Sequence, residues 1–316
     1  MKILNIEPVG YSKKAKVELE KLGELTEATP TREELIQLIP EYDVLIVRLA
    51  HKIDRKIIEA ARLLKVIVTA TTGLNHIDLN AAEQHGIKIL SLRGETSFLQ
   101  KITSTAELTM GLILSLTRKI PQAHQHVLST GWDRDSFKGH ELRNKTLGIV
   151  GFGRLGRIVA RYGKAFFMNV VATDPFVNSA PHWVRLVELE ELLATSDIIS
   201  LHVNLSEKTR NFFGREQFQL IKKKAIFINT SRGELVDESA LIEALESGQI
   251  SGAGIDVLTG ETSGSSHWLQ ESSLWKYAKK HNNIILTPHI GGATYEAMEE
   301  TELFMVNKLK TFLENM

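Results

Sequence analysis

The most informative segment of this chain is Thr146-Leu147-Gly148-Ile149-Val150-Gly151-Phe152-Gly153-Arg154-Leu155-Gly156. A short apolar run leads directly into three glycines with the spacing Gly-x-Gly-x-x-Gly, and a helix-like segment, Arg157–Ala165, follows them. The first glycine of such a loop permits a tight turn, the second lets the backbone approach a pyrophosphate, and the third lets helix and strand pack closely. Amide groups at the start of the helix then face the phosphates. The segment therefore predicts the first strand-loop-helix unit of a dinucleotide-binding sheet.

An acidic residue stands where this interpretation requires one. Asp174 directly follows the next apolar run, Asn169–Thr173, and lies eighteen residues after Gly156. A carboxylate at this strand end can bind both adenosine ribose hydroxyls and repel a 2′-phosphate, which favours NAD over NADP. The alternative is a glycine turn and a strand-end aspartate in a fold that binds nothing, and the complete strand-loop-helix context disfavours it.

Apolar runs alternate with helix-like segments on both sides of this loop, as in doubly wound sheets. Thr31 followed by Glu34 fits the capping box of one of these helices. The strand candidates of the series that starts at the loop are Thr146–Val150, Asn169–Thr173, Ile198–Leu201, Ala225–Asn229, Gly252–Asp256 and Ile284–Leu286. The strand candidates of the earlier series are Lys2–Ile6, Val44–Arg48, Val66–Ala70 and Lys88–Ser91.

The two series predict an α/β protein with two doubly wound parallel-sheet domains. We expect a Rossmann NAD-binding domain over residues 99–288 and a smaller, flavodoxin-like substrate domain. The smaller domain is discontinuous, with residues 1–98 and 289–316, because Ala293–Leu313 is typical of a terminal helix that crosses back. A long helical stretch, Thr103–Thr130, contains Pro121, which should kink or restart it.

Composition excludes several classes of function. Lys and Arg total 38 and Asp and Glu total 38, so the zero net charge gives no sign of a nucleic-acid-binding protein. The chain has no cysteine, which excludes disulfides, thiolate metal sites and cysteine nucleophiles and is compatible with a reducing cytoplasm. The apolar run near residues 108–116 is too short to span a bilayer, and the first residues lack the apolar run of a signal peptide. His124 and His126 do not share a helix face, so we expect no metal site.

Three polar side chains follow predicted strands of the second series. They are Arg232, Glu261 and His289. Ligands of open α/β sheets bind beyond the carboxyl ends of the strands, so these residues can converge on one crevice. Histidine can transfer a proton near neutral pH, a neighbouring carboxylate favours its charged form, and arginine can bind a carboxylate at two points. These residue types suit hydride transfer between a hydroxyl and a carbonyl group.

Three further motifs resemble the D-isomer-specific 2-hydroxyacid dehydrogenase family, most closely its D-3-phosphoglycerate dehydrogenase-like branch. The resemblance covers residues 44–294, and its motifs occur in order at compatible spacing. The motifs are Glu141-Leu142-Arg143-Asn144-Lys145-Thr146-Leu147-Gly148-Ile149-Val150, Asn229-Thr230-Ser231-Arg232-Gly233-Glu234-Leu235-Val236-Asp237-Glu238 and Leu286-Thr287-Pro288-His289-Ile290-Gly291-Gly292.

The resemblance implies a role for each matching residue. His289 is the acid/base, Glu261 is its carboxylate partner, and Arg232 binds the substrate carboxylate and polarises the keto oxygen. The backbone amides of Thr72 and Gly73 are the donors of a substrate-binding loop, where His289 and Arg232 also contact the substrate. The residues implied in cofactor binding are Gly151, Gly153, Arg154, Leu155, Gly156, Asp174, Val203, Thr209, Thr230, Ser231, Asp256 and Gly291, with Asp256 contacting the nicotinamide amide.

The chain departs from the family pattern at several positions. Thr71 and Thr262 replace a usual glycine and proline, and the segments 93–102 and 262–283 are extended. Two interpretations of these extensions are open: they shape the substrate pocket, or they are longer surface loops without a role in binding. A phosphorylated substrate needs further cations, for which Arg48 and Arg93 are candidates; Arg48 can instead pair with a backbone carbonyl or an acid such as Asp43.

The resemblance implies an NAD-dependent oxidoreductase that interconverts a D-2-hydroxy acid and its 2-keto acid by hydride transfer, with D-3-phosphoglycerate as one candidate. A reaction like that of formate dehydrogenase is disfavoured, because that branch has an amide in place of Glu261. A non-catalytic, NAD-sensing regulatory protein on the same fold stays open. The long helical stretch and Trp132 resemble the family's dimer arm, so we expect a homodimer, a small-molecule substrate, and neither nucleic acid nor membrane as a partner.

Overall fold

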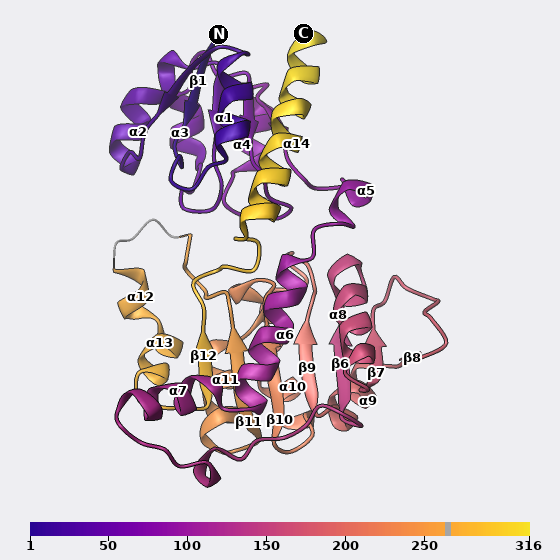
Figure 1. Ribbon diagram of the computed structural model, residues 1–316. Helices are drawn as coiled ribbons and strands as arrows, with labels where there is room; N and C mark the ends of the chain where they lie inside the picture. The colour runs from indigo at the N-terminus through magenta and orange to yellow at the C-terminus, as the bar shows by residue number, and fades with distance from the viewer. Residues whose placement is uncertain (263–266) are drawn as a thin grey trace. The chain divides into compact units, whose positions relative to one another are not determined.

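The computed structural model describes residues 1–262 and 267–316, which form two compact units (Figure 1). The first unit comprises Met1–Ile102, Glu261–Trp268 and Ala293–Met316, and the second comprises Thr103–Gly260 and Leu269–Gly292. Each unit is built on one parallel β-sheet. The predicted fold class, α/β with two doubly wound parallel-sheet domains, is confirmed.

The first unit has a five-stranded sheet in the order β2-β1-β3-β4-β5, with every pairing parallel. Four of the strands were predicted, whereas β2 was missed because its sequence, Glu-Leu-Thr-Glu, is polar and its residues are half-buried or exposed at the sheet edge. The strands are β1 (Lys2–Asn5), β2 (Glu24–Glu27), β3 (Val44–Ile46), β4 (Val66–Val68) and β5 (Lys88–Leu90).

Helices cover both faces of this sheet, as alternating burial along β1 shows. Ile3 belongs to a core with α1 and α14, whereas the next residue, Leu4, belongs to a separate core with α2, α3 and α4. Thr31 and Glu34 form the predicted capping box at the start of α2. The helices are α1 (Lys13–Glu20), α2 (Arg32–Leu38), η1 (Ile39–Glu41), α3 (Arg55–Ala60), α4 (Leu79–Gln84), α5 (Thr96–Leu99) and α14 (Tyr295–Glu314).

The second unit has a seven-stranded parallel sheet in the order β12-β11-β10-β9-β6-β7-β8. The strand order reverses between β6 and β9, which is where ligands bind in such sheets. The short edge strand β8 was not predicted, because its three residues include an exposed arginine. The strands are β6 (Thr146–Val150), β7 (Asn169–Thr173), β8 (Val184–Leu186), β9 (Ile198–Leu201), β10 (Ala225–Asn229), β11 (Ile250–Ile255) and β12 (Ile284–Leu286).

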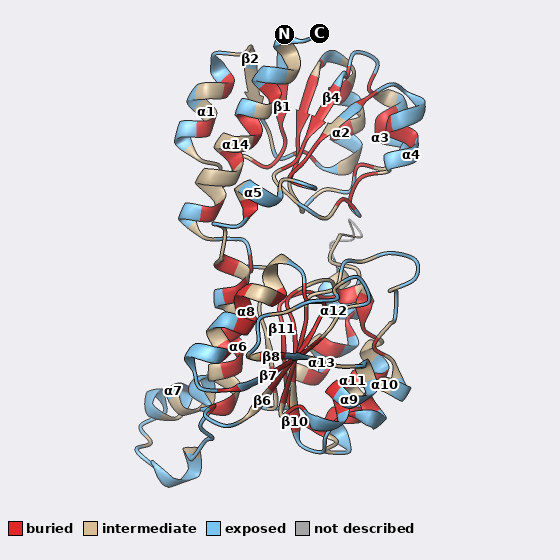
Figure 2. Cartoon of the chain, turned by 90° about the vertical axis from the view of Figure 1, so that its right-hand side faces the viewer, coloured by how far each residue is buried: buried red, intermediate tan, exposed pale blue. Residues whose placement is uncertain are grey.

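The helices of this unit pack on both faces of the sheet around an apolar core, drawn red in Figure 2. A second apolar group joins the aromatic rings of Phe213, Phe218 and Phe227. The helices are α6 (Ser104–Thr117), α7 (Ile120–Leu128), η2 (Asp135–Phe137), α8 (Arg154–Ala165), α9 (Leu189–Thr195), α10 (Arg215–Leu220), η3 (Gly233–Leu235), α11 (Glu238–Glu246), α12 (Trp268–Glu271) and α13 (Ser273–Ala278).

The stretch Thr103–Thr130 is two helices rather than one. The chain turns at Lys119, which has a left-handed backbone with φ of 53°, and α7 restarts with Pro121 in its first turn. This agrees with the restart expected at the proline. Whereas half of the residues of α6 are buried, α7 has no buried residue and is pale blue or tan in Figure 2.

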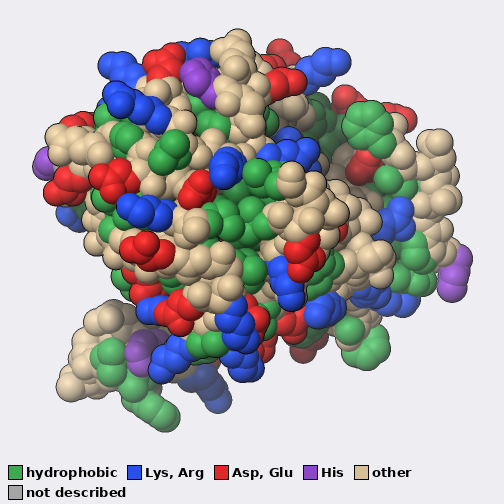
Figure 3. Space-filling view, turned by 90° about the horizontal axis from the view of Figure 1, so that it is seen from above, with side chains coloured by type: hydrophobic (Ala, Val, Ile, Leu, Met, Phe, Trp, Pro, Cys, Tyr) green, Lys and Arg blue, Asp and Glu red, His purple; other side chains and the backbone are tan. Residues whose placement is uncertain are grey.

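The surface carries charges of both signs. On the face shown in Figure 3, Lys and Arg side chains are interspersed with Asp and Glu side chains. This mixture agrees with the balanced composition of the chain. Within the described ranges, no helix is both long and apolar enough to span a bilayer.

Candidate active site

Two of the three glycines in the loop between β6 and α8 leave no room for a side chain, and the third borders open space. Gly151 has φ of 93°, and a Cβ there would lie 2.6 Å from the carbonyl oxygen of His202. A Cβ on Gly156 would lie 2.2 Å from the carbonyl oxygen of Gly151, so this glycine lets α8 approach the loop. A Cβ on Gly153 would meet no described atom within 4 Å, so this position borders open space.

Helix α8 begins at the loop without a side-chain cap. Its N-cap residue is Gly153, which has no side chain to accept from the first amides. Arg154, Leu155 and Gly156 form the first turn, whose amides point along the helix axis toward the loop. The partial positive charge of a helix N-terminus and these amides suit an anion such as a pyrophosphate.

Asp174 lies at the carboxyl end of β7, next to the glycine loop. Its Oδ2 accepts a 2.8 Å hydrogen bond from the amide of Phe152, and its Oδ1 accepts a 2.9 Å bond from the amide of Phe176. Both bonds fix the direction of the carboxylate. Pro175 and Phe176 follow it, so no cation adjoins it in sequence to neutralise its charge.

The residues after β9 serve mainly to shape the neighbouring loop. His202 accepts or donates a 2.9 Å hydrogen bond with Ser200, and burial lowers its pKa to about 4, so its imidazole is neutral at physiological pH. Val203 follows it and is half-buried. The hydroxyl of Thr209 donates to the carbonyl oxygen of Asn204 over 2.8 Å and thereby closes the next turn.

A turn beyond β10 holds Arg232 through the buried side chain of Asn229. The Asn229 Oδ1 accepts from the amide of Ser231 over 3.0 Å, and its Nδ2 donates to the carbonyl oxygen of Arg232 over 2.8 Å. The hydroxyl of Ser231 donates to Leu201, and that of Thr230 bonds to Thr109 of α6. The hydroxyls of both motif residues are therefore used within the protein.

Asp256 organises the loop that carries His289. Its buried carboxylate accepts from the Thr287 hydroxyl over 2.5 Å, from the Ile290 amide over 2.9 Å and from the Gly291 amide over 2.8 Å. Burial raises the pKa of Asp256, while these hydrogen bonds and the charge of His289 oppose the rise. The cluster fixes the path of residues 287–291 around one carboxylate.

The backbone of His289 is constrained as well. Its amide donates to the carbonyl oxygen of Asp256 over 2.8 Å and to that of Thr287 over 3.0 Å. Its φ of 52° is in the left-handed region, which residues other than glycine seldom adopt. A conformation of this kind persists where surrounding contacts enforce it, and it is frequent at functional sites.

The predicted substrate loop lies in the first unit, after β4. The hydroxyl of Thr71 donates to the carbonyl oxygen of Gly73 over 2.8 Å and bonds with the hydroxyl of Thr69 over 3.0 Å. No hydrogen bond joins the amides of Thr72 and Gly73 to another described group. Their role as substrate donors stays a prediction.

The sequence of the second unit matches a known family over most of its length. Residues 110–291 match the model described as "D-isomer specific 2-hydroxyacid dehydrogenase, NAD binding domain". The chain belongs to the D-isomer-specific 2-hydroxyacid dehydrogenase family. It carries this family's NAD-binding domain, with the glycine loop, Asp174, Arg232 and His289 inside the matched range.

Two dehydrogenase or reductase relatives are similar to the chain over nine tenths of its length. D-3-phosphoglycerate dehydrogenase of Methanocaldococcus jannaschii is 41% identical over 300 residues, which are 93% of this chain and 54% of that protein. Hydroxypyruvate reductase of Thermotoga maritima is 40% identical over 286 residues, which are 90% of each protein. The chain spans about half the length of the D-3-phosphoglycerate dehydrogenases that it matches.

A solved 2-hydroxyacid dehydrogenase shares the fold. D-lactate dehydrogenase from Aquifex aeolicus, crystallised with NAD and lactic acid, superposes with a TM-score of 0.85 and 28% sequence identity. The superposition covers 100% of this chain and 96% of that one. The resemblance to the family predicted from three motifs is thus confirmed by sequence and by structure.

The structure explains one departure from the family pattern. Where the family usually has glycine, the side chain of Thr71 closes the substrate loop through its hydrogen bonds to Gly73 and Thr69. Arg48 is committed within the first unit: its Nη2 donates to the carbonyl oxygens of Glu7 and Val9 over 2.9 and 2.7 Å. The expected alternative of backbone pairing therefore holds for Arg48, whereas its acidic neighbours are Glu7 and Glu302 rather than Asp43.

Glu261 follows β11 in sequence and is half-buried. By its contacts it groups with the first unit, whereas Arg232 and His289 belong to the second. Its pairing with His289 stays a prediction. In the extended segment 262–283, Ser263–Ser266 lie outside the described residues. The described part contains α12 and α13, and Lys279, the C-cap residue of α13, lies over the ring of Trp275.

Two residues with a clear task were not singled out from the sequence. Asn229 holds the Arg232 turn, and Thr287 donates to Asp256. Both residues lie inside the quoted motifs. The signal that could have identified them is a polar motif residue at the end of a predicted buried strand.

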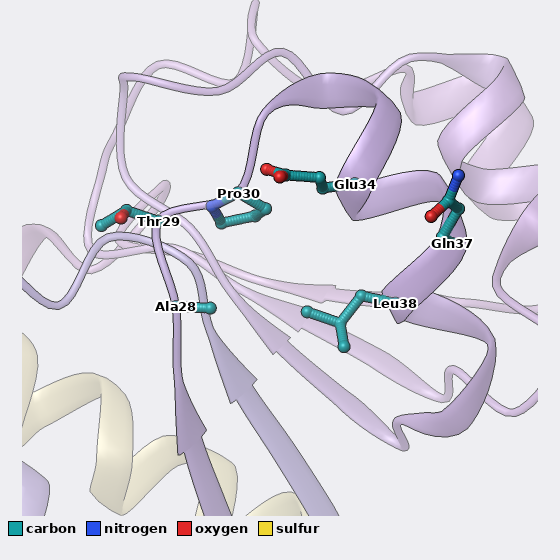
Figure 4. A pocket seen from close by; sticks show the side chains of 6 residues that line it. All are labelled: Ala28, Thr29, Pro30, Glu34, Gln37 and Leu38. Carbon is teal, nitrogen blue, oxygen red and sulfur yellow. The ribbon is translucent and has the colours of Figure 1, made fainter.

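Two surface depressions lie elsewhere, in the first unit. One of about 420 Å³ lies between the 28–30 loop and α2, where Glu34 points toward Pro30 (Figure 4). The Glu34 carboxylate already accepts from the amide of Thr31 in the capping box. The other, of about 610 Å³, is bordered by α3 and contains the ion pair of Arg32 with Asp54. Neither contains a predicted site residue.

Proposed function

We propose that this chain is an NAD-dependent oxidoreductase that interconverts a D-2-hydroxy acid and its 2-keto acid. One observation carries the proposal: the buried carboxylate of Asp256 holds the loop of His289 at the carboxyl edge of the sheet that also carries the glycine loop. A proton-transferring side chain and a dinucleotide loop on one sheet edge are what hydride transfer at a hydroxyl carbon requires.

The cofactor fits the residues present. Gly153 leaves open space where a pyrophosphate approaches, the first turn of α8 supplies amides, and Asp174 is fixed to bind the adenosine ribose. When bound, NAD supplies the hydride acceptor of the oxidation and NADH the donor of the reduction. The remaining implied cofactor contacts, Val203, Thr209, Thr230, Ser231 and Gly291, act through their backbone or by shaping the loops.

The protein's own side chains move the proton and orient the substrate. His289 removes the hydroxyl proton during oxidation and donates it to the keto oxygen during reduction. Arg232 binds the substrate carboxylate and polarises the keto oxygen, as a guanidinium can do with two donors. Glu261 orients the imidazole of His289, and the amides of Thr72 and Gly73 bind the substrate carboxylate.

The domain organisation follows from these roles. We assign cofactor binding to residues 99–288 and substrate binding to residues 1–98 and 289–316. The support is that the glycine loop and Asp174 lie in the larger unit, while the open amides of Thr72 and Gly73 lie in the smaller one.

A homodimer and a cytoplasmic location complete the proposal. Support for the dimer is the apolar surface of α7 and the following segment, where Ile120, Val127, Leu128 and Trp132 are exposed. Such a surface is typical of an interface. Support for the location is the complete absence of cysteine.

Turnover tests the proposal most directly. NADH consumption is measured with purified protein and a panel of 2-keto acids that differ in size and charge. We expect at least one to be reduced at an ordinary enzymatic rate, on the order of 1–10³ per second. NADH binding without turnover of any 2-keto acid would instead support the non-catalytic, NAD-sensing alternative.

A further inference from the structure

The segment after β5 brings a cation to the substrate loop. The amide of Leu92 donates to the carbonyl oxygen of Thr71 over 3.0 Å, so the two loops run side by side. The Nε of Arg93 lies 3.4 Å from the carbonyl oxygen of Thr72. The guanidinium of Arg93 thus lies at the carbonyl oxygen of the peptide group that joins Thr72 to Gly73, in the loop that carries the unbonded amides of both residues.

This segment is anchored, so the position of Arg93 is defined. Lys308 of α14 donates to the carbonyl oxygen of Ser91 over 3.0 Å. The ring of Phe98 stacks on that of Phe304 at a centroid distance of 4.0 Å, and Leu99 is buried. The extension that the sequence predicted around residues 93–102 is therefore packed on α14 at its end, while Arg93 at its start is exposed to solvent.

The charge of Arg93 is not compensated. In the described part of the chain no carboxylate forms an ion pair with it, and the nearest acid in sequence, Glu95, pairs with Lys308 over 2.5 Å. The other candidate cation, Arg48, donates to internal carbonyl groups and lies 3.5 Å from Glu302. Of the two candidate cations, Arg93 is thus the one with no carboxylate partner among the described residues; it uses its Nε on the Thr72 carbonyl, and its two Nη groups can bind an external anion.

We propose that Arg93 binds a second anionic group on the substrate, while the amides of Thr72 and Gly73 bind the carboxylate next to the keto group. The inference rests on the proposed function and deepens it, since it names the substrate class: a 2-keto acid whose far end carries a phosphate or a carboxylate. A guanidinium suits both anions, because its parallel N–H donors match two oxygens of either group.

Paired substrates test the role of Arg93. Kinetic constants with NADH are measured for hydroxypyruvate and its phosphate ester, and for pyruvate and oxaloacetate, which differ by one anionic group. In Arg93→Gln we expect kcat/KM to fall about 10–100-fold for the dianionic member of the preferred pair, the usual effect of one hydrogen bond to a charged group. The monoanionic member should change by less than about twofold, and Arg93→Lys should retain part of the difference. If Arg93→Gln loses the preference for the phosphate ester over hydroxypyruvate, the second anionic group is a phosphate. If it loses the preference for oxaloacetate over pyruvate, that group is a carboxylate.

Lys101 provides the matched control. It lies on the same segment, is exposed, and pairs with Glu300 of α14 away from the substrate loop. Lys101→Gln should leave the ratio of kcat/KM between the paired substrates unchanged. Equal losses for monoanion and dianion in Arg93→Gln would show a role only in loop structure and would overturn the proposal, as would a wild-type enzyme without preference for either dianion.

Binding separates this inference from the proposed function. Calorimetric titration of the NADH-loaded protein with the phosphate ester of hydroxypyruvate and with oxaloacetate needs no turnover. Tighter binding of a dianion than of its monoanionic partner, lost in Arg93→Gln, supports the anion site even when no substrate is reduced. Equal binding of both members in wild type and variant contradicts it, whatever the outcome of the turnover assay.

Discussion

The buried carboxylate of Asp256 accepts a 2.8 Å hydrogen bond from the amide of Gly291, two residues beyond His289. Because Oδ1 of the same carboxylate binds the amide of Ile290 and the hydroxyl of Thr287, the loop closes around a single side chain. A buried acceptor with three donors is difficult to replace, since a missing bond leaves a buried donor unpaired. The placement of His289 thus depends on an aspartate that precedes it by more than thirty residues.

Asp256→Asn should damage this arrangement without removing volume. One oxygen becomes an NH₂ group that faces the amide of Gly291 or the donors at Oδ1. We expect a loss of about 1–3 kcal/mol in the free energy of unfolding and a kcat reduced by about 10²-fold, the scale of a misplaced acid/base. Thermal unfolding and steady-state kinetics measure both. Wild-type kcat in a folded Asp256→Asn protein would show that the loop is positioned by other contacts.

The glycine loop offers a pair of matched substitutions. In Gly153→Ala the added Cβ meets no described atom within 4 Å and φ is −77°, so the fold should be unaffected while NADH affinity falls at least about tenfold. In Gly156→Ala the added Cβ would lie 2.2 Å from the carbonyl oxygen of Gly151. We therefore expect the free energy of unfolding to fall by about 1–3 kcal/mol. Thermal unfolding without cofactor and fluorescence titration with NADH separate the two effects. Unchanged NADH affinity in Gly153→Ala would place the pyrophosphate elsewhere.

Cofactor selectivity should depend on Asp174. Its fixed carboxylate repels a 2′-phosphate, so we expect the wild type to prefer NADH to NADPH. Asp174→Asn removes the charge and retains an oxygen acceptor for one of the two amides, and the ratio of kcat/KM between the two cofactors should fall about tenfold or more. The measurement is the same assay run with each cofactor. A wild-type preference for NADPH would contradict the assignment.

Stability should depend on pH through Glu302. This buried carboxyl of α14 accepts a 2.6 Å bond from the amide of Ser12 and lies near Arg48 and Tyr11, and burial raises its pKa from 4.5 to about 7. The folded state therefore binds more protons than the unfolded state between these values, and stability falls as pH rises through this window. Relative to wild type, Glu302→Gln should gain about 1–3 kcal/mol between pH 4.5 and 7.

Thermal unfolding across this pH range measures the effect of Glu302. The control is Glu299→Gln on the same helix, whose partly exposed carboxylate pairs with Lys14 and should give a nearly constant difference from wild type. A constant difference between wild type and Glu302→Gln would show that the Glu302 carboxyl titrates alike in both states.

The exposed apolar residues near α7 predict the oligomeric state. Light scattering at micromolar concentration should return twice the chain mass of 35.4 kDa. The double variant Leu128→Glu and Trp132→Ala should dissociate, because both side chains are more than half exposed in the single chain. Val9→Glu, which changes an equally exposed apolar residue of the first unit, should remain dimeric. A wild-type mass of one chain would remove the dimer from the proposal.

The sequence predicted most of the fold because buried parallel strands are continuous apolar runs. Ten of the strands were predicted in this way, including the edge strands β5 and β12, which keep apolar residues. The other two edge strands, β2 and β8, carry polar residues and lack the apolar run that indicates a strand. Pairing with a neighbour in space, which the local pattern does not encode, is what makes them strands.

The candidate site was predictable to a different degree. Gly151, Asp174 and His289 stand in motifs whose spacing encodes their place at strand ends. The sequence did not predict that Arg48 donates to the carbonyl oxygens of Glu7 and Val9, or that Thr209 donates within its own turn. These bonds depend on the direction in which each side chain points. Direction depends on the neighbours that the fold supplies, which a linear pattern of residue types leaves open.

The packing of α14 has a consequence for the order in which the chain becomes stable. Met305, Val306 and Leu309 of this helix are buried against α1 and the first sheet, and in Figure 1 the yellow helix lies beside α1. Burial of such side chains contributes about 1.5–3 kcal/mol each. When the ribosome has synthesised residues 103–292, every strand of the larger unit is present. The smaller unit still lacks α14, the helix that covers part of one face of its sheet. An apolar face of residues 1–102 therefore stays uncovered until α14 has been synthesised and can pack against it.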